Sequence, residues 1–207
     1  MIRPPGFRGA AFGAAADGDG RGRDEERRAI SSELGISADW AWLRQVHSDR
    51  VLQAEAPGVL GEGDAAFSTV PGLPMVVGTA DCFPVVLESD GAAGIAHAGW
   101  RGAVAGTVSA LREAMAAAGR PPLRAAVGPG IGPCCFEVGP AVAGRFPGYG
   151  ATTTWGTGSV DLPAVLRAQL EGLAVWESGT CTMCGTGYHS YRRDGTRARQ
   201  VAVAWRA

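Results

Sequence analysis

Residues 94–102 have the sequence GIAHAGWRG, and here an apolar run gives way to a helical pattern. A histidine at such a junction can point into a cleft, and the small residues Ala98 and Gly99 let a ligand approach the backbone. Arg101 stands at the helix start, where the helix dipole favours anions, so a bound phosphate or carboxylate would account for it. The alternative interpretation is a core histidine with its hydrogen bonds satisfied, beside a surface arginine.

Apolar, β-branched runs before this stretch predict buried strands at residues 75–79 and 85–87. Residues 80–84, Ala-Asp-Cys-Phe-Pro, interrupt them, and an aspartate and a cysteine at such a point need an explanation. After the stretch, residues 102–118 are predicted to form a helix that ends at Gly119. Its apolar residues recur at spacings of four, three and four: Val104, Val108, Leu111 and Met115.

The remaining pattern predicts an α+β fold in one domain, residues 1–207, of which residues 1–23 are poorly patterned and expected to be loop or a weak edge strand. Helices are predicted over residues 24–34, over a short segment within 136–146, and after Asp161, which caps a helix with proline in its first turn. A turn is predicted at residues 61–64. Further strands are predicted at residues 42–47, 51–54, 95–97, 123–127, 173–176, 180–183 and 200–205. Strands outnumber helices and come in adjacent pairs, which favours mixed α/β layers over a strictly alternating parallel sheet.

The composition excludes several classes of protein. The chain has 207 residues and a formal net charge of −1, with no basic excess of the kind that a nucleic-acid-binding protein shows. It contains no apolar run of membrane-spanning length and no signal-peptide pattern, so we expect a cytoplasmic protein that is not embedded in a membrane. Five cysteines, an odd number, favour thiols or metal ligands over a disulfide framework.

Only three histidines occur, and two of them make candidate metal ligands together with one cysteine. His47, Cys82 and His97 each follow or interrupt a strand-like run. Two imidazoles and one thiolate are a known zinc ligand set that leaves a fourth position open, the pattern of a catalytic site. Copper accepts the same donors, ordinary core packing is the plain alternative, and a Cys82–His97 nucleophile pair is a third reading.

Four other cysteines also have suggestive spacing. Cys181 and Cys184 form a Cys-x-x-Cys motif, and Cys134 and Cys135 are adjacent. Because no helix start follows Cys181 and adjacent cysteines chelate poorly, we interpret the four as buried thiols. The Gly128-x-Gly130 segment has proline in place of the third glycine of a dinucleotide-binding motif, which excludes a Rossmann site.

Longer motifs carry a resemblance to a known family and cover about residues 24–205. They are Gln45-Val46-His47-Ser48, Gly63-Asp64-Ala65, Thr79-Ala80-Asp81-Cys82-Phe83-Pro84, His97-Ala98-Gly99-Trp100-Arg101-Gly102, residues 128–138 (GPGIGPCCFEV), Asp161-Leu162, Cys181-Thr182 and residues 190–195 (SYRRDG). In this order and spacing they resemble the YfiH/YlmD family, also called the laccase-domain or multicopper polyphenol oxidase family. The resemblance implies a four-layer α-β-β-α sandwich with mixed sheets.

The resemblance also implies a function. It implies one Zn²⁺ per chain held by His47, Cys82 and His97, and phosphorolysis of purine nucleosides (adenosine, inosine, guanosine and methylthioadenosine) together with deamination of adenosine. The partners would be a purine nucleoside and phosphate, with no nucleic acid. Arg27 and Arg101 are candidates for phosphate binding.

Two further residues of these motifs are given roles. Gln45 is a candidate for substrate or phosphate binding, and Asp81 is a catalytic candidate that orients a ligand, moves protons or caps a turn. The chain departs from the family at Glu26, at His189, which we assign to the pocket rim, and near its amino terminus, where the usual segment is eroded. These departures bear on substrate choice, whereas the metal ligands are retained.

Three alternative functions stay open at this point. A copper-dependent phenol oxidase is disfavoured because three histidines cannot ligate both a type 1 copper and a trinuclear cluster. A cysteine-dependent amide hydrolase, for example in the editing of cell-wall precursors, would use Cys82 as its nucleophile. A non-enzymatic protein would keep the metal only for folding.

Overall fold

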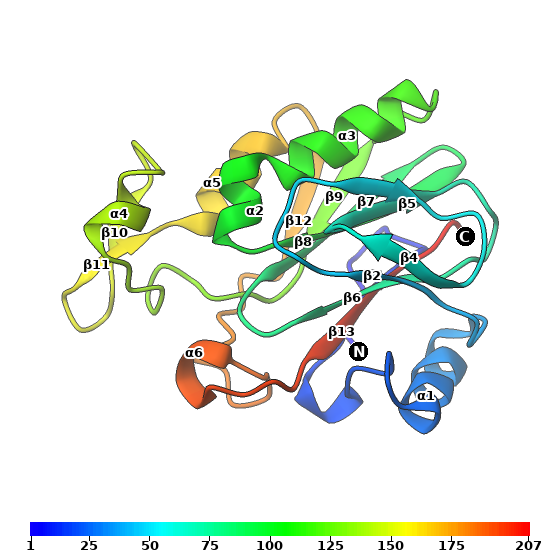
Figure 1. Cartoon of the computed structure of the whole chain (residues 1–207), viewed down its shortest axis with the longest axis horizontal. Coiled ribbons are helices and arrows are strands. Elements are labelled where there is room, and N and C mark those ends of the chain that lie inside the picture. The colour runs from blue at the N-terminus through cyan, green and yellow to red at the C-terminus, as the bar shows by residue number, and fades with distance from the viewer.

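Two mixed β-sheets pack face to face, and helices cover both outer surfaces (Figure 1). The computed structural model describes residues 1–207. The six-stranded sheet has the order β12-β9-β7-β8-β5-β3, and the five-stranded sheet has the order β1-β13-β6-β2-β4. A separate hairpin pairs β10 with β11.

The elements have the following bounds. The strands of the six-stranded sheet are β3 (Val51–Gln53), β5 (Ala65–Ser68), β7 (Phe83–Ser89), β8 (Ala92–Ala98), β9 (Arg124–Val127) and β12 (Ala174–Glu177). Those of the five-stranded sheet are β1 (Ala10–Phe12), β2 (Ala41–Arg44), β4 (Gly58–Glu62), β6 (Met75–Thr79) and β13 (Gln200–Ala204), and the hairpin consists of β10 (Gly150–Thr152) and β11 (Gly158–Val160). The helices are α1 (Asp24–Leu34), α2 (Trp100–Ala105), α3 (Thr107–Ala117), α4 (Pro140–Ala143), α5 (Leu162–Gln169) and α6 (Tyr191–Asp194), and a 3-10 turn covers Ala15–Asp17.

Three separate apolar clusters fill the three interfaces between the four layers. Val85 and Leu87 on β7 belong to the cluster beneath α2, α3 and α5, whereas Val86 between them belongs to the cluster between the sheets. This alternation is what a strand buried on both faces requires. On β13, Val201 faces the third cluster, which includes residues of α1. The predicted four-layer α-β-β-α sandwich is therefore confirmed.

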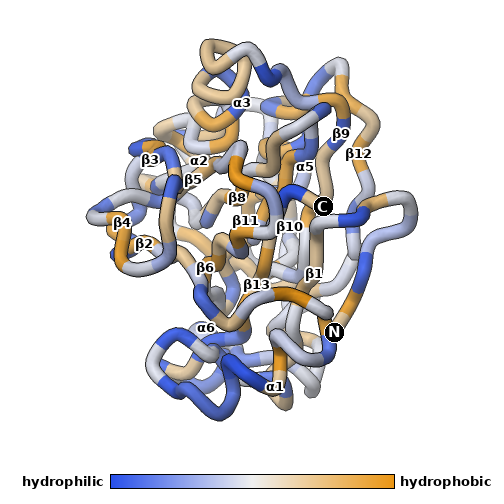
Figure 2. The backbone as a smooth tube through the Cα atoms, turned by 90° about the vertical axis from the view of Figure 1, so that its right-hand side faces the viewer, coloured by the Kyte–Doolittle hydropathy of each residue, from blue (hydrophilic) through white to orange (hydrophobic).

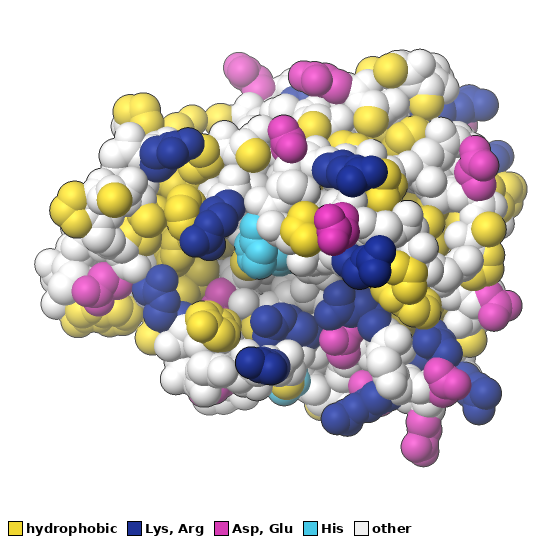
Figure 3. Space-filling view, viewed as in Figure 1, with side chains coloured by type: hydrophobic (Ala, Val, Ile, Leu, Met, Phe, Trp, Pro, Cys, Tyr) yellow, Lys and Arg dark blue, Asp and Glu magenta, His cyan; other side chains and the backbone are white.

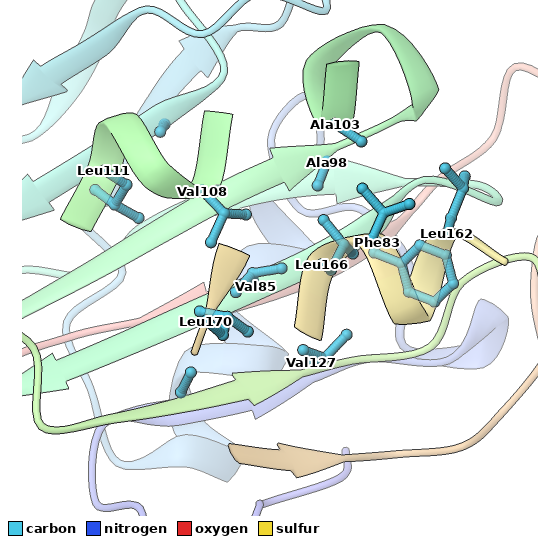
Figure 4. Packing of buried hydrophobic residues seen from close by; sticks show 14 of the residues in the cluster. Phe83, Val85, Ala98, Ala103, Val108, Leu111, Val127, Leu162, Leu166 and Leu170 are labelled. Atoms are coloured by element: carbon cyan, nitrogen blue, oxygen red, sulfur yellow. The ribbon is translucent and has the colours of Figure 1, made fainter. Parts of the chain in front are cut away.

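The helical side of the molecule shows how tightly these layers pack. Figure 4 shows Val108 and Leu111 of α3 and Leu166 of α5 on the side of the sheet where Val85 and Val127 also lie, all within one apolar cluster. The hydropathy colouring follows the same division, with apolar segments in the central strands and hydrophilic segments in the surrounding loops and α1 (Figure 2). No helix combines the length and the apolar character needed to cross a lipid bilayer.

Local signals correctly predicted two helices. α1 begins with three acidic residues, which interact favourably with the helix dipole, and ends at Gly35, whose φ of 70° is left-handed. α5 follows Asp161, whose Oδ1 accepts a hydrogen bond from the backbone N–H of Ala164 at 3.0 Å. Both predictions are confirmed because each helix carries its own start or stop signal.

The single helix predicted over residues 102–118 is two helices. α2 begins earlier, at Trp100, and Gly106 separates it from α3 with a left-handed φ of 84°. The predicted stripe is buried only in α3, whereas Val104 on α2 is half-buried. The apolar spacing continued through Gly106, so periodicity alone did not reveal the break.

Other segments also differ from the prediction. Residues 180–183 form a turn with a single bridge from Cys181 to Gly130 instead of a strand. The predicted turn at residues 61–64 overlaps the end of β4, and the expected helix within residues 136–146 covers only α4. The amino-terminal segment does contain an edge strand: β1 is fully buried and pairs with β13.

Candidate metal centre and cleft

Strand order brings the three predicted ligands together. β2 and β6 are parallel neighbours, so the residues that follow them, His47 and Cys82, emerge at the same edge of the five-stranded sheet. His97 lies on β8 of the other sheet, directly opposite Pro84 of β7. The ligand atoms of the three side chains lie within 4.8 Å of one another.

The spacing and chemistry of these donors fit a transition-metal ion. The sulfur of Cys82 lies 3.9 Å from Nε2 of His47, and a tetrahedral zinc ion with ordinary bond lengths separates such donors by about 3.6 Å. His47 is exposed and Cys82 half-buried, whereas His97 is buried. The group can therefore bind a metal from one side and leave the other side open to the cleft.

A buried carboxylate orients His97. Oδ1 of Asp64 lies 2.8 Å from Nδ1 of His97, which leaves Nε2 of that ring as its metal-facing nitrogen. The other carboxylate oxygen of Asp64 accepts hydrogen bonds from the backbone N–H groups of Val46 and Ser48 on either side of His47. One aspartate therefore positions both histidines, an arrangement typical of protein metal sites.

The metal-free side chains strongly perturb one another. Burial opposes ionisation of Cys82, but the positive charge of His97 and a hydrogen bond from His47 lower the pKa of this thiol to about 6. Burial likewise opposes protonation of His97, but the Cys82 thiolate and Asp64 raise the pKa of this imidazole to about 9. At a pH between about 6 and about 9, Cys82 is therefore a thiolate, which is the form that binds a metal or attacks an electrophile.

Two strained residues lie at this site. His47 and Asp81 are the only non-glycine residues with positive φ, 61° and 82°. Such conformations cost free energy in non-glycine residues and concentrate at functional sites. In His47 and next to Cys82, the strained backbone turns the ligands away from their strands and toward each other.

Gly99 is required by the closeness of the ligands. A Cβ atom at this position would lie 2.7 Å from the sulfur of Cys82 and 3.0 Å from Cδ2 of His47. The first distance is too short for a carbon atom and the second is unusually tight, so a side chain here would displace the Cys82 sulfur and crowd the His47 ring. The small residue noted at the start of the helical pattern therefore leaves room for the predicted ligands to converge.

The three side chains lie in the wall of a cleft of about 850 Å³, within the usual size range of small-molecule sites. Figure 3 shows histidine side chains at a hollow that arginine side chains surround. Five arginines line it: Arg21, Arg44, Arg101, Arg192 and Arg199. Four aromatic residues do so as well: Trp42, Trp100, Phe136 and Tyr191.

The charge in the cleft is not balanced by its two acidic residues. Asp19 pairs with Arg21, and Asp81 accepts hydrogen bonds from the Thr182 hydroxyl and the Arg192 backbone N–H, both at 2.7 Å. Arg101 makes no ion pair, and its guanidinium lies 4.4 Å from the centre of the Trp100 ring. The guanidinium of Arg44 has no acidic partner either. The cleft therefore combines free positive charge with aromatic surface.

Of the other predicted site residues, some line the cleft and others do not. Gln45 lines the cleft, but its amide bonds both backbone groups of Gly78 and accepts a hydrogen bond from Arg21. Arg27 does not line the cleft: it pairs with Asp24 and lies 5.8 Å from the centre of the Trp42 ring. His189, expected at the rim, is also absent from the cleft wall.

Sequence reasoning missed several cleft residues. Arg21 lies in the glycine-rich segment that we expected to be unpatterned, and its guanidinium reaches Gln45 at 2.6 Å. Arg192 and Arg199 belong to a group of arginines near the carboxyl terminus, and no local pattern distinguishes these two as cleft residues. Asp64 stood inside a motif, but no local signal revealed that it faces His97.

The interpretation of the remaining cysteines as buried thiols is wrong in part. Cys184 is exposed, and only Cys135 is buried. The sulfur atoms of Cys134, Cys135, Cys181 and Cys184 all lie within 4.8 Å of one another. We refer to these residues as the four-cysteine cluster; none of them lines the cleft.

Comparisons with known proteins agree with this architecture. A purine nucleoside phosphorylase of Deinococcus radiodurans is 42% identical over 193 residues, which cover 86% of this chain and 75% of the relative. Purine nucleoside phosphorylase ORF3 of Streptomyces griseus is 37% identical, with 94% and 85% covered. YlmD of Geobacillus stearothermophilus superimposes with a TM-score of 0.86 at 25% identity, covering 100% of this chain and 98% of that one.

A further solved structure supports the fold alone. YfiH of Bacillus licheniformis superimposes with a TM-score of 0.84 at 23% identity, covering 96% of this chain and 92% of that one. The model of the family described as multi-copper polyphenol oxidoreductase laccase matches residues 5–207, nearly the whole chain. The sequence motifs, the fold and this match together show that the chain belongs to that laccase-like family, as its resemblance to YfiH and YlmD predicted.

Proposed function

We propose that the protein is a zinc-dependent purine nucleoside phosphorylase that also deaminates adenosine. The observation that carries the proposal is the position of the His47–Cys82–His97 group in the wall of a cleft with unpaired arginines and aromatic side chains. The names of the relatives in Deinococcus and Streptomyces point to the same chemistry. We take adenosine, inosine, guanosine and methylthioadenosine as the substrates to test.

The residues present fit zinc. Two imidazole nitrogens and one thiolate sulfur, with a carboxylate behind one imidazole, form a common catalytic zinc ligand set. A zinc ion held by them would supply a Lewis acid with one coordination position open to the substrate. Copper accepts the same donors, but a multicopper oxidase needs many more histidines, and the only other histidine in this chain, His189, lies outside the cleft.

The arginines suit phosphate. Arg101 and Arg44 have guanidinium groups without acidic partners in the cleft, and a guanidinium binds phosphate oxygens through two parallel hydrogen bonds. In phosphorolysis a phosphate oxygen bonds to C1′ of the ribose while the bond from C1′ to the purine nitrogen breaks. Arg101, four residues after His97 and in the wall of the same cleft, is our candidate for holding the attacking phosphate. Arg27 would act on the cleft only indirectly, through the Trp42 ring.

Aromatic and polar side chains suit the nucleoside. Trp100 and Tyr191 offer ring faces on which a purine can stack. Gln45 already satisfies the backbone of Gly78, so we assign it to holding Arg21 and the cleft wall in place. Asp81 accepts hydrogen bonds at both oxygens, which supports a positioning role for it beside Cys82.

Deamination would take place in the same cleft without phosphate. Adenosine and water give inosine and ammonia, so the purine C6 must reach the metal group, whereas phosphorolysis places the ribose C1′ beside phosphate. The cleft of about 850 Å³ offers room for both orientations. We further propose that the protein acts in the cytoplasm, where the thiol of Cys82 would stay reduced.

A second candidate function is a cysteine-dependent amide hydrolase. The low pKa of Cys82, about 6, and the neighbouring imidazole of His97 favour it, because this pair resembles an activated nucleophile and its partner. The Cys82 sulfur would attack an amide carbonyl and form a thioester as the amine leaves with a proton from His97, and water would then hydrolyse the thioester to a carboxylic acid and the free thiol. Such a reaction needs no metal, so removal of zinc separates the two candidates.

A nucleoside panel tests the proposal. Purified protein would be incubated with each purine nucleoside, with and without phosphate, and the products identified by mass spectrometry. We expect free base and ribose 1-phosphate only with phosphate, inosine from adenosine without it, and loss of both after chelation or in Cys82→Ala. Turnover of no purine nucleoside by the zinc-loaded protein would refute the proposal.

A further inference from the structure

We propose that a second metal site, which holds one zinc ion, is formed by the four-cysteine cluster. Two loops bring the four sulfur atoms together from places 46 or more residues apart in the chain. The site is separate from the cleft and independent of the proposed phosphorylase activity, so either proposal can fail without the other.

Neighbouring parallel strands align the two cysteine pairs. β9 and β12 pair in parallel, and a bridge from Gly130 to Cys181 extends this pairing beyond the strands. The backbone N–H of Gly130 donates to Thr180 at 3.2 Å, and that of Thr182 donates to Gly130 at 3.0 Å. The loop with Cys134 and Cys135 therefore lies directly against the turn with Cys181 and Cys184.

The sulfur positions suit a metal better than a disulfide. The sulfur of Cys184 lies 3.6 Å from that of Cys134 and 3.2 Å from that of Cys135. Both distances exceed the length of a disulfide bond, about 2.05 Å. Four thiolates bound tetrahedrally to zinc lie about 3.8 Å apart, close to the observed spacing.

The turns around the cluster answer the objection that adjacent cysteines chelate poorly. The backbone N–H groups of Cys135 and Phe136 both donate to the carbonyl of Gly132 at 3.0 Å, which coils this loop tightly. As a result, Cys134 and Cys135 both direct their sulfur atoms at Cys184. The Cys181–Cys184 segment is itself a turn, closed by a hydrogen bond from Gly185 to the carbonyl of Cys181 at 2.9 Å.

A backbone N–H group faces one sulfur atom of the cluster, and an arginine supports the turn that carries two of the cysteines. The N–H of Gly132 donates to the sulfur of Cys181 at 3.2 Å. The guanidinium of Arg193, which also pairs with Asp194, donates to the carbonyls of Thr182, Met183 and Gly185 and so holds the turn in shape.

A zinc ion bound to the four-cysteine cluster would anchor the segment that leads from Cys181 to α6, part of which lines the cleft. Thr182, between the two cysteines of the turn, donates its hydroxyl to Asp81, next to the predicted ligand Cys82. The same segment continues into α6 with Tyr191 and Arg192, which line the cleft. We therefore assign a structural role to the second ion, in keeping with a site whose four positions are all taken by protein.

Metal analysis of paired variants tests the proposal. We expect two zinc ions per chain in the native protein, one in Cys184→Ser, one in Cys82→Ser and none in the double variant. Each single variant is the matched control for the other, because the change in chemistry is the same. Zinc absorption spectroscopy on Cys82→Ser would show four sulfur neighbours at about 2.3 Å, which does not require the Cys184 variant to fold.

Three results would overturn the second site. One is a Cys82→Ser protein that folds but retains no zinc, and another is a zinc ion in that variant with nitrogen neighbours. The third is an intact mass that reveals a disulfide among the four cysteines in protein purified without reductant. Cobalt loading gives a second readout, since the thiolate-to-cobalt absorption of Cys82→Ser should disappear on adding Cys184→Ser.

Discussion

The carboxylate of Asp64 and the imidazole of His97 form a 2.8 Å contact in which neither side chain is more than 5% exposed. The contact fixes the ring so that Nε2 faces Cys82, and the same carboxylate holds the backbone around His47. Asp64 thus holds the predicted ligands His47 and His97 in position without any ion. The residue supplies no predicted ligand, yet two of the three ligands depend on it.

Replacing Asp64 with asparagine should weaken metal binding about 10–100-fold, because His97 loses the partner that orients its ring. The dissociation constant for zinc can be measured by competition with a chromophoric chelator. Asp49→Asn is the matched control, since Asp49 is exposed, lies in the neighbouring loop and forms no side-chain hydrogen bond. Equal affinities in the two variants would show that the Asp64–His97 contact does not prepare the site.

Gly99→Ala should abolish metal binding at the His47–Cys82–His97 group while the protein stays folded. The added Cβ would approach the Cys82 sulfur to 2.7 Å and push apart two ligands. Zinc content and circular dichroism measure the two effects separately. Gly139→Ala serves as control, because nothing lies within 4 Å of a Cβ there. A Gly99→Ala protein that keeps its zinc at this group would contradict the geometry described above.

In the metal-free protein, Cys82 should react with iodoacetamide at a rate that is nearly constant above pH 7 and declines tenfold per pH unit well below pH 6. The reason is that the pKa of the Cys82 thiol is lowered from 9.0 to about 6, so the thiolate persists to lower pH than in an ordinary cysteine. Peptide mass spectrometry can follow Cys82 separately from the other four cysteines. In His97→Gln the midpoint should rise toward 9, and an unchanged midpoint would exclude His97 as the cause.

Arg101→Gln should raise the KM for phosphate about 10–100-fold, which corresponds to the roughly 1.5–3 kcal/mol of a hydrogen bond to a charged group. Zinc content should not change, because Arg101 is not a ligand. Steady-state kinetics with varied phosphate gives the answer. Arg197→Gln removes an exposed arginine outside the cleft and should have no effect on this KM. If both variants behave alike, the phosphate lies elsewhere.

Leu111→Ala should lower the free energy of unfolding by about 2–5 kcal/mol, because Leu111 is fully buried on the inner face of α3 and its truncation leaves a cavity. Leu123→Ala removes the same atoms from a side chain that is 63% exposed and should change the stability by less than about 0.5 kcal/mol. Denaturant titration measures both. A small loss for Leu111→Ala would mean that α3 is not part of the cooperative core.

Local sequence signals predicted those elements that carry their own start and stop. Residues 24–34 contain an acidic first turn and a terminal glycine, and Asp161 caps its helix, so both helices were identified. The break at Gly106 was missed because the apolar spacing continues through it, and the Cys181–Cys184 turn was missed because its position depends on a distant partner, Gly130. Such contacts join residues far apart in the chain and leave no periodic pattern.

The candidate site likewise contains residues that local sequence signals identify and residues that only long-range contacts reveal. His47, Cys82 and His97 were chosen by residue type and by their positions beside strands, but spacing alone favoured ordinary core packing over a metal site. Only the family resemblance made them one group, because their convergence depends on which strands are neighbours. Arg21 had no signal at all, since its role comes from one long-range hydrogen bond to Gln45.

The placement of His47 after β2 and of His97 on β8 has a mechanical consequence. These strands belong to different sheets, and the chain crosses from one sheet to the other at Cys82. An ion bound by all three side chains would cross-link the five-stranded sheet to the six-stranded sheet. A metal ion bound there would then resist sliding of one sheet over the other. Thermal stability and the proposed activity would therefore rise and fall together.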